Sequence, residues 1–333
     1  GDSLSWDYYF ISKGHTRISG RDPELPNVST QSGFFNWGPI DVPDDQMQDV
    51  RTVNWAKAEL GKTHNKPFFL ACGFFRPHLP WYVPKKYFDK FPLDEIILPE
   101  VISDDLDDLP EYGKRFARER YSGSWGTDLN KGERDHDLVV KYDQWKKGVQ
   151  AYLASISFVD TYVGELLDGL DKSKYADNTI IVLWGDHGWH LGEKQHWRKQ
   201  ALWEDTTHVP FILSYPKKIA ENSICEYPVS FIDIFPTLID LAGIPKKEDL
   251  DGKSLKELLI NPSMKWNRPV LSTYGKGNHA VRSGKWRYIQ YRDGSSELYD
   301  HQNDPNEWYN LSDKEDSQEV IKRLKKVIPV KER

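Results

Sequence analysis

Residues Thr179–Pro210 read TIIVLWGDHGWHLGEKQHWRKQALWEDTTHVP, and this stretch is the most informative about the fold. Its first part, Ile180–Trp184, is an apolar run typical of a buried strand in a parallel sheet. The run stops at Gly185, and Asp186 and His187 follow at once. Because ligands in open α/β sheets gather outside the carboxyl ends of the strands, we expect these two side chains at a binding rim.

The residues of this rim predict an anion site that includes a metal. A carboxylate and an imidazole can together ligate a hard or borderline divalent cation. A cationic group follows them in the chain, made up of Lys194, His196, Arg198 and Lys199. Positive charge beside a metal suits an anionic substrate, so the pattern indicates phosphate- or sulfate-ester chemistry.

Helical and strand patterns alternate around the rim. Apolar residues, Ile156 and Val163 among them, recur at three- and four-residue steps in Tyr142–Leu170, which predicts a helix before the Ile180–Trp184 strand. Two more helices and two more apolar strands are predicted at Asp44–Leu60, Ser230–Ala242, Phe68–Phe75 and Val209–Tyr215. We therefore predict an α/β fold with a mostly parallel sheet flanked by helices over residues 1–262.

The character of the chain changes after Pro262. Short alternating strands are predicted at 280–282, 286–291 and 297–299, joined by turns at Ser283-Gly284 and Asp293-Gly294. A charged amphipathic helix is predicted at 315–328. Residues 263–333 therefore read as a C-terminal subdomain with a small antiparallel sheet and a helix.

Composition excludes several classes of function. A chain of 333 residues can bury a large core. Its net charge of -6 gives no basic field, so we expect no nucleic-acid partner. No window approaches the roughly 18 consecutive apolar residues of a membrane span, so none is expected. Its two cysteines do not make a disulfide framework.

A second polar group is predicted at the same rim. His78 follows the apolar run Phe68–Phe75, in the turn Arg76–Trp81, just as Asp186 and His187 follow theirs. Two strands of one parallel sheet would bring all three side chains to one edge. The acidic cluster at residues 104–108 reads instead as a solvated loop, and no metal is assigned to it.

At this point the residues carry a family resemblance, which covers about Asp41 to Leu311. GDHGWHLGE, followed by HWRK and THVP, resembles the type I sulfatases of the alkaline-phosphatase superfamily. PFFLACGFFRPHLPW is similar to the stretch before that family's sulfate-binding histidine, and RPHLPWYVPKKYFDKFP looks most like iduronate-2-sulfatase-like members. The tail HAVRSGKWRYIQYRDGSSELYDHQNDPNEWYNL is similar to the family's C-terminal subdomain. An alkaline-phosphatase-like fold is implied.

The resemblance also implies roles for individual residues. Asp186 and His187 match metal ligands, usually for Ca²⁺, with Mg²⁺ as the other candidate. His78 matches the histidine that binds the sulfate and protonates the leaving oxygen, and Lys199 matches the lysine that contacts the same sulfate. Such groups would stabilise the charge that develops on bond cleavage.

The pocket residues follow the family less closely. Trp189, His196 and Arg198 are expected to line the substrate pocket. Lys194 stands where the family usually has a histidine, so it is left out of the catalytic set.

The family's nucleophile is not found in this sequence. It is a formylglycine made from Cys or Ser in a Cys/Ser-x-Pro/Ala-x-Arg motif, which does not occur in the 333 residues. The family's Asp-Asp metal pair and its Gly-Lys-x-x-x-His segment are missing too. We therefore expect the C-terminal part of a sulfatase without its N-terminal strands, inactive as an isolated chain. The nucleophile would lie in a missing N-terminal part or on a second polypeptide.

Three functions remain open at this stage. The first is a sulfatase acting on a sulfated sugar or glycosaminoglycan-like substrate, in the periplasm, outside the cell or in the lysosome. The second is a phosphodiesterase or phosphonate monoester hydrolase of the same superfamily. The third is a non-catalytic fragment that binds sulfated glycans. The resemblance favours the first.

Overall fold

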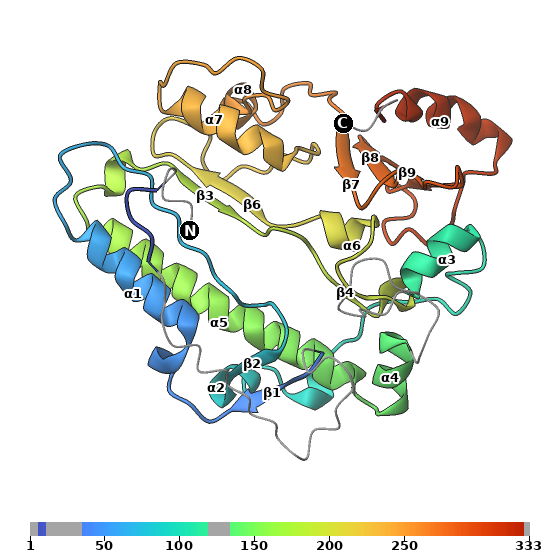
Figure 1. Ribbon diagram of the computed structural model, residues 1–333, viewed down its shortest axis with the longest axis horizontal. Helices are drawn as coiled ribbons and strands as arrows, with labels where there is room; N and C mark the ends of the chain where they lie inside the picture. Colours follow the sequence, from blue (N-terminus) through green and yellow to red (C-terminus); the bar gives the residue numbers. More distant parts are fainter. Residues whose placement is uncertain (1–5, 11–34, 119–133, 330–333) are drawn as a thin grey trace. The chain divides into compact units, whose positions relative to one another are not determined.

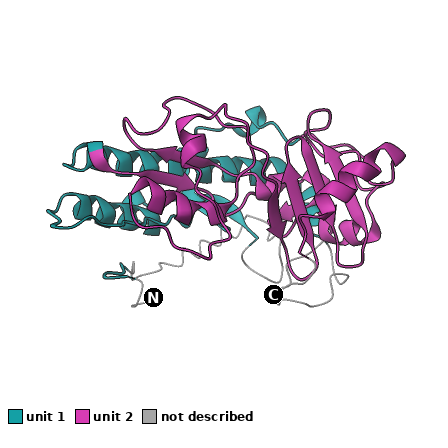
Figure 2. Cartoon of the chain, turned by 90° about the horizontal axis from the view of Figure 1, so that it is seen from above, with its two compact units in different colours: residues 1–99, 121–127, 132–177 teal, residues 100–120, 128–131, 178–333 magenta. Residues whose placement is uncertain are grey.

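The computed structural model describes residues 6–10, 35–118 and 134–329. The chain forms two compact units, coloured teal and magenta in Figure 2. The first comprises residues 1–99, 121–127 and 132–177, and the second comprises residues 100–120, 128–131 and 178–333. The boundaries of these units do not coincide with the predicted division at residue 262. That division stays a prediction.

Two helices and a pair of strands organise the first unit (Figure 1). The long helix α5 (Trp145–Asp171) packs against α1 (Gln48–Leu60) and against strand β2 (Trp81–Pro84). Strand β2 pairs in parallel with β1 (Trp37–Ile40), with Trp37 opposite Trp81. The unit also contains the short helices α2 (Lys85–Phe88) and α4 (Asp135–Lys141) and the 3-10 turns Asp44–Gln46 and Leu93–Glu95.

The predicted helices of this unit exist, but the buried face of α5 differs from the prediction. Ala151, Ala154 and Phe158 are fully buried, whereas Ile156 of the predicted apolar stripe is 42% exposed. Ala151 and Ala154 let this face of the helix pack closely on its neighbours, and Phe158 packs its ring on that of Tyr87 of α2, 5.3 Å away.

The second unit contains three antiparallel sheets. Strand β3 (Ile181–Trp184) pairs with β6 (Phe211–Ser214), and β4 (His190–Leu191) pairs with β5 (Trp197–Arg198). The third sheet has the order β10-β9-β8-β7. Helices complete the unit: α3 (Glu111–Ala117), α6 (Glu204–Thr207), α7 (Ile234–Leu241), α8 (Lys256–Ile260) and α9 (Gln318–Lys325). Further 3-10 turns of this unit lie at Glu193–Gln195, Phe231–Asp233 and Glu315–Ser317, and the turn Ala176–Asn178 spans the point in the sequence where the first unit ends.

The predicted C-terminal sheet is present with four strands. They are β7 (Val270–Thr273), β8 (His279–Ser283), β9 (Trp286–Gln290) and β10 (Ser296–Asp300). The two predicted turns join β8 to β9 and β9 to β10, and Gly284 and Gly294 have φ angles of 57° and 90°. Glycine adopts this left-handed region without the cost that a side chain imposes. Helix α9 covers one face, where Leu324 packs against Tyr288 and Leu298.

The prediction of a mostly parallel sheet is not confirmed. In the described part of the chain, parallel pairing is limited to β1 and β2, and β3 and β6 run antiparallel. The apolar runs did predict these two strands correctly, but an apolar run carries no information on direction. Trp184 at the end of β3 is 45% exposed, so the strand is less buried than predicted.

The run Phe68–Phe75 is an extended segment outside any sheet of the described chain. At its end the backbone N–H groups of Phe75 and Arg76 donate to the carboxylate of Asp49, at 2.8 and 3.1 Å. At this end of the segment, a carboxylate of α1 accepts the backbone hydrogen bonds that a neighbouring strand would accept in a sheet. Among the described helices, none is long and apolar enough to cross a membrane.

Candidate functional site

The predicted rim brings together Asp186, His187 and Lys199. Both Asp186 and His187 directly follow Gly185, the residue after β3, and the backbone there leaves the sheet. The Nζ atom of Lys199 lies 2.8 Å from Nε2 of His187. The carboxylate Oδ2 of Asp186 lies 3.6 Å from the same Nε2, and its side chain is 85% exposed. Three of the four residues expected to bind metal and sulfate therefore form one cluster.

The hydrogen bonds of His187 assign its tautomer. The Nδ1 atom lies 2.9 Å from the carbonyl oxygen of Gly188, which can only accept, so Nδ1 carries the proton. The Nε2 atom then has a lone pair, which accepts a hydrogen bond from the ammonium of Lys199. A backbone carbonyl that orients an imidazole in this way is the usual support of a metal-binding histidine.

Lys199 has an altered acidity at this position. Partial burial lowers the pKa of the Lys199 ammonium, and the carboxylate of Asp186 works against this by raising it. An ammonium that is partly stripped of water binds an anion more strongly than a fully hydrated one. The side chain is therefore suited to contacting a negatively charged group.

Backbone hydrogen bonds to α6 hold the loop after His187 in place. The N–H of Gly188 donates to the carbonyl of Thr206 and the N–H of Trp189 to the carbonyl of Asp205, each at 2.7 Å. A Cβ atom on Gly188 would lie 1.9 Å from the Asp205 oxygen, so only glycine permits this approach. The position of His187 therefore depends on the position of α6.

His78 belongs to the first unit, whereas the other rim residues belong to the second. Its side chain is exposed, and its Nδ1 lies 2.6 Å from the carbonyl of Leu79. Its ring lies 4.9 Å from the ring of Phe75.

The three predicted pocket residues differ in accessibility. Trp189 is half-buried, and its ring centre lies 6.1 Å from that of His187. His196 is only 2% exposed and Arg198 only 6% exposed, so both side chains lie in the interior of the unit. Burial lowers the pKa of His196 to about 4, and its Nδ1 lies 3.3 Å from the carbonyl of Ala117. Of the three, Trp189 is the one with surface beside the rim.

Lys194 has a structural role, and this corrects the prediction for part of the acidic cluster. Its Nζ lies 2.5 Å from Oδ1 of Asp105, also donates to the carbonyl of Glu307, and lies over the ring of Tyr299. Asp105 is only 4% exposed. The prediction that Asp105 lies in a solvated loop is therefore wrong, because Lys194 neutralises the carboxylate in the interior.

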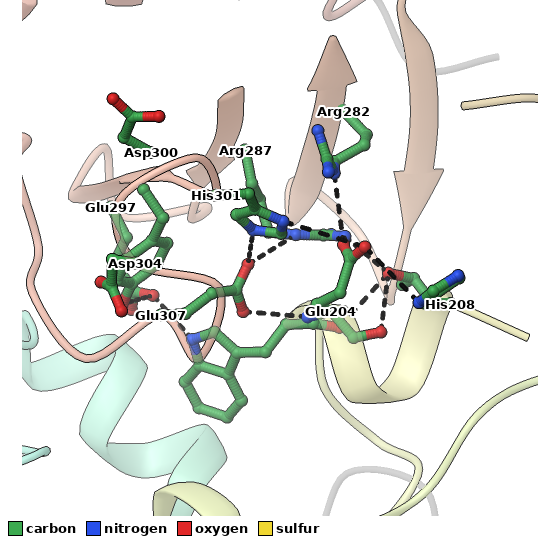
Figure 3. A network of polar contacts seen from close by, with 12 residues as sticks. Glu204, His208, Arg282, Arg287, Glu297, Asp300, His301, Asp304 and Glu307 are labelled. Carbon is green, nitrogen blue, oxygen red and sulfur yellow. Dashed lines mark hydrogen bonds and ion pairs between the residues drawn. The ribbon is translucent and has the colours of Figure 1, made fainter. Parts of the chain in front are cut away.

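The sequence analysis did not predict a network of charged residues that includes Glu204 of α6 (Figure 3). Arg287 of β9 lies between Glu204 and Glu307, with Nε 2.7 Å from the Glu307 carboxylate. His301 lies 2.7 Å from the same carboxylate, and Arg282 lies 3.3 Å from Glu204. Burial raises the pKa of Glu204, but Arg287 and Arg282 outweigh it and hold the pKa at about 2. No spacing motif links these residues, so the sequence offered no signal for them.

This network does not fit a metal ion. Ligand atoms of Glu204, His301 and Glu307 lie within 4.8 Å of one another, which is one group of three in the described residues. The guanidinium of Arg287 already contacts both carboxylates. A cation would have to displace a buried, fully charged arginine, so we assign the cluster to charge pairing.

The pair Asp186 and His187 does fit a cation in part. Two ligands at about 2.4 Å from one ion and at right angles to each other are about 3.4 Å apart, and the two atoms here are 3.6 Å apart. The ammonium of Lys199 already presents positive charge to this imidazole nitrogen. Two donors are fewer than the six to eight oxygens that Ca²⁺ takes. The pair therefore supplies part of a coordination shell.

Comparison with known proteins gives consistent matches. The family model for sulfatases matches residues 6–244. The model for the C-terminal region of N-sulphoglucosamine sulphohydrolase matches residues 192–332. A sulfatase from Formosa agariphila is 41% identical over 324 residues, which are 97% of this chain and 59% of that protein. Human iduronate 2-sulfatase is 32% identical over 62% of this chain and 42% of its own length.

Solved structures show a similar fold. A protein in complex with its substrate D-glucosamine-2-N,6-O-disulfate has a TM-score of 0.67 at 24% identity, over 84% of this chain and 68% of that one. Phosphonate monoester hydrolase of Agrobacterium radiobacter has a TM-score of 0.70 at 21% identity, over 95% of this chain and 66% of that one. The chain spans 59% of the length of the Formosa agariphila relative.

Proposed function

Because the chain belongs to the sulfatase family, we propose that it carries the metal-binding and sulfate-binding part of a sulfuric ester hydrolase. The observation that carries this proposal is the cluster in which the ammonium of Lys199 lies 2.8 Å from His187, beside Asp186. An imidazole nitrogen, a carboxylate and an ammonium at one rim can bind a cation and an anionic ester together.

Each proposed residue has a task in the hydrolysis. A sulfate monoester and water give an alcohol and sulfate, with one proton released. The bond between sulfur and the bridging oxygen breaks, and negative charge develops on that oxygen. Lys199 binds a non-bridging sulfate oxygen, and His78 gives its proton to the departing oxygen. Trp189, His196 and Arg198 are proposed to line the substrate pocket, and of these Trp189 has the accessible surface, because His196 and Arg198 are buried.

A divalent cation is part of the proposal. Asp186 and His187 would hold it, with Ca²⁺ as the first candidate and Mg²⁺ as the second. When bound, the cation acts as a Lewis acid that stabilises negative charge. A cation held at Nε2 of His187 would use the lone pair that faces the ammonium of Lys199 here, so the ammonium would be available to the anionic substrate.

The nucleophile is proposed to lie outside this chain. The family's Cys/Ser-x-Pro/Ala-x-Arg motif does not occur in the 333 residues. The isolated chain is accordingly expected to be inactive, with the formylglycine supplied by a longer polypeptide or by a second one. The remaining metal ligands would come from the same source.

The proposed substrate is a sulfated sugar, as in glycosaminoglycans. Two matches support this: a relative named iduronate 2-sulfatase, and a solved structure that holds D-glucosamine-2-N,6-O-disulfate. Action in the periplasm, outside the cell or in the lysosome is proposed on the same basis. The division into residues 1–262 and 263–333 is kept as a proposal for how the chain is organised.

A second candidate is hydrolysis of phosphonate monoesters or phosphodiesters. The fold likeness to phosphonate monoester hydrolase, with a TM-score of 0.70, favours it. A sulfate monoester, a phosphonate monoester and a phosphodiester each carry one negative charge, so one cationic rim can serve either activity. Non-catalytic binding of sulfated glycans is the third outcome.

The natural gene product that contains this chain tests the proposal. It is assayed with 4-nitrophenyl sulfate, 4-nitrophenyl phenylphosphonate and sulfated glucosamine, with and without a calcium chelator. We expect sulfate release that the chelator abolishes and that Lys199→Met lowers about 10²- to 10³-fold. Lys62→Met, an exposed lysine paired with Glu59, is the control. Faster phosphonate turnover supports the second candidate, and binding of sulfated glucosamine without turnover supports the third.

A further inference from the structure

Arg287 stands at the centre of the contacts that hold α6 in place. The side chain is 2% exposed. Its Nη1 donates to the carbonyl of Leu202 and its Nη2 to the hydroxyl of Thr207, each at 2.9 Å. It also forms an ion pair with Glu204. One guanidinium therefore binds a carbonyl two residues before α6, the first residue of the helix and its last.

Glu307 completes the arrangement from the other side. Its Oε1 lies 2.7 Å from Nε of Arg287, and its Oε2 accepts the N–H of Glu204 at 2.9 Å. The first N–H of a helix has no partner within the helix, so this carboxylate satisfies it. Figure 3 shows Glu307, Glu204 and His301 gathered around the same guanidinium.

Helix α6 depends on these contacts. It has four residues, and a single helical turn does not form stably without tertiary partners. The carbonyls of Asp205 and Thr206 in this turn accept the N–H groups of Trp189 and Gly188 at 2.7 Å. A shift of α6 therefore moves the residues that directly follow His187.

We propose that Arg287 is a positioning residue for the rim, acting through Glu204 and α6 on the loop that carries His187. The connection consists of two ion pairs and two backbone hydrogen bonds, without a direct contact between Arg287 and the rim. The effect on hydrolysis rests on the proposed function, whereas the effect on the loop does not.

An arginine is required by the geometry. Its planar fork matches four groups at once: Nη1 donates to Leu202, Nη2 contacts Glu204 and Thr207, and Nε lies within ion-pair distance of Glu307. A lysine can keep the charge but cannot serve Leu202, Thr207 and both carboxylates together. The difference between Arg287→Lys and Arg287→Gln thus separates loss of the charge from loss of the fork.

Amide hydrogen exchange tests the proposal without any substrate. In Arg287→Gln we expect exchange at Gly188 and Trp189 to accelerate about 10-fold or more, while Val281 of β8 and Leu298 of β10 keep their protection. Arg287→Lys should give an intermediate acceleration. The matched control is Arg268→Gln, because Arg268 pairs with the buried Asp233 of the same unit and does not contact α6.

The natural gene product supplies the second readout. A misplacement of about 1 Å at a reacting group can cost about 10²-fold, so we expect kcat for sulfate release to fall 10- to 100-fold in Arg287→Gln, with KM changed less than about 3-fold. Equal acceleration of exchange at all four amides, or the same pattern in Arg268→Gln, would overturn the proposal. If the unaltered protein releases no sulfate, the exchange result still decides it.

Discussion

The ammonium of Lys199 lies 2.8 Å from Nε2 of His187, twelve positions earlier in the chain. The lysine thus contacts a ring nitrogen of the residue that the family resemblance assigns to a metal ion. If a cation bound this Nε2 atom, its lone pair could not also accept a hydrogen bond from Lys199. Binding of the cation would free the ammonium for an anion.

This competition predicts opposite effects of one substitution. Lys199→Met should bind Ca²⁺ more tightly than the unaltered protein, because the competing ammonium is gone. In the natural gene product the same substitution should slow sulfate release about 10²- to 10³-fold, because the charge proposed to contact the ester is lost. Calorimetric titration with Ca²⁺ and a sulfate-release assay measure the two effects. Weaker calcium binding in the variant would contradict the competition.

Gly188 should not accept any side chain. A Cβ atom there would lie 1.9 Å from the carbonyl oxygen of Asp205, which is backbone and cannot move aside. We expect Gly188→Ala to lower the free energy of unfolding by about 2 kcal/mol or more. Gly164→Ala is the control, because a Cβ at this α5 position meets no atom within 4 Å, and it should stabilise by about 0.5–1 kcal/mol. Urea denaturation measures both, and an unchanged midpoint for Gly188→Ala would refute the close approach.

The buried ion pair of Lys194 and Asp105 predicts a large loss of stability when one partner is removed. The two side chains are 3% and 5% exposed, so Lys194→Met leaves a carboxylate charge in the interior. The expected loss is about 3–5 kcal/mol in the free energy of unfolding, and Asp105→Leu in addition should restore part of it. The exposed pair of Lys85 and Asp89 gives the comparison: Lys85→Met should cost about 0.5 kcal/mol or less.

We expect the folded protein to lose stability in acid because His196 is buried. Burial lowers its pKa to about 4 in the folded state, from an ordinary value of about 6.5. The folded state therefore binds fewer protons than the unfolded state between these values, and stability falls as the pH drops from about 6.5 to 4. The neighbouring His190, also fully buried, acts in the same direction.

We expect His196→Gln to remove up to about 3 kcal/mol of this pH dependence, as 2.303RT per unit implies. Thermal or urea unfolding at pH 7, 5.5 and 4.5 measures it. His208→Gln is the control, because the side chain of His208 is 78% exposed. An identical slope for His196→Gln and the unaltered protein would show that the imidazole is already protonated when folded.

Local sequence patterns predicted most of the elements. The periods of apolar residues in Tyr142–Leu170 and Ser230–Ala242 correspond to α5 and to the 3-10 turn that leads into α7. The glycine turns at Gly284 and Gly294 correspond to the hairpins of the C-terminal sheet. Strand direction was not predictable, because the run Phe211–Ser214 would read the same in either direction. Phe68–Phe75 pairs with no strand of the described chain, and the bonds from Phe75 and Arg76 to Asp49 at its end are not predictable from a local pattern.

Local sequence was enough to identify the family and to predict the rim. The strand end, Asp186, His187 and Lys199 all lie within one short stretch, Thr179–Pro210. Which polar residues pair with each other in the interior became visible in the folded chain alone. Lys194 pairs with Asp105 across 89 positions, and Arg287 holds Glu204 across 83. Such pairs form because a charge that leaves water must meet its opposite in the interior. No local pattern specifies which distant residue that opposite charge will be.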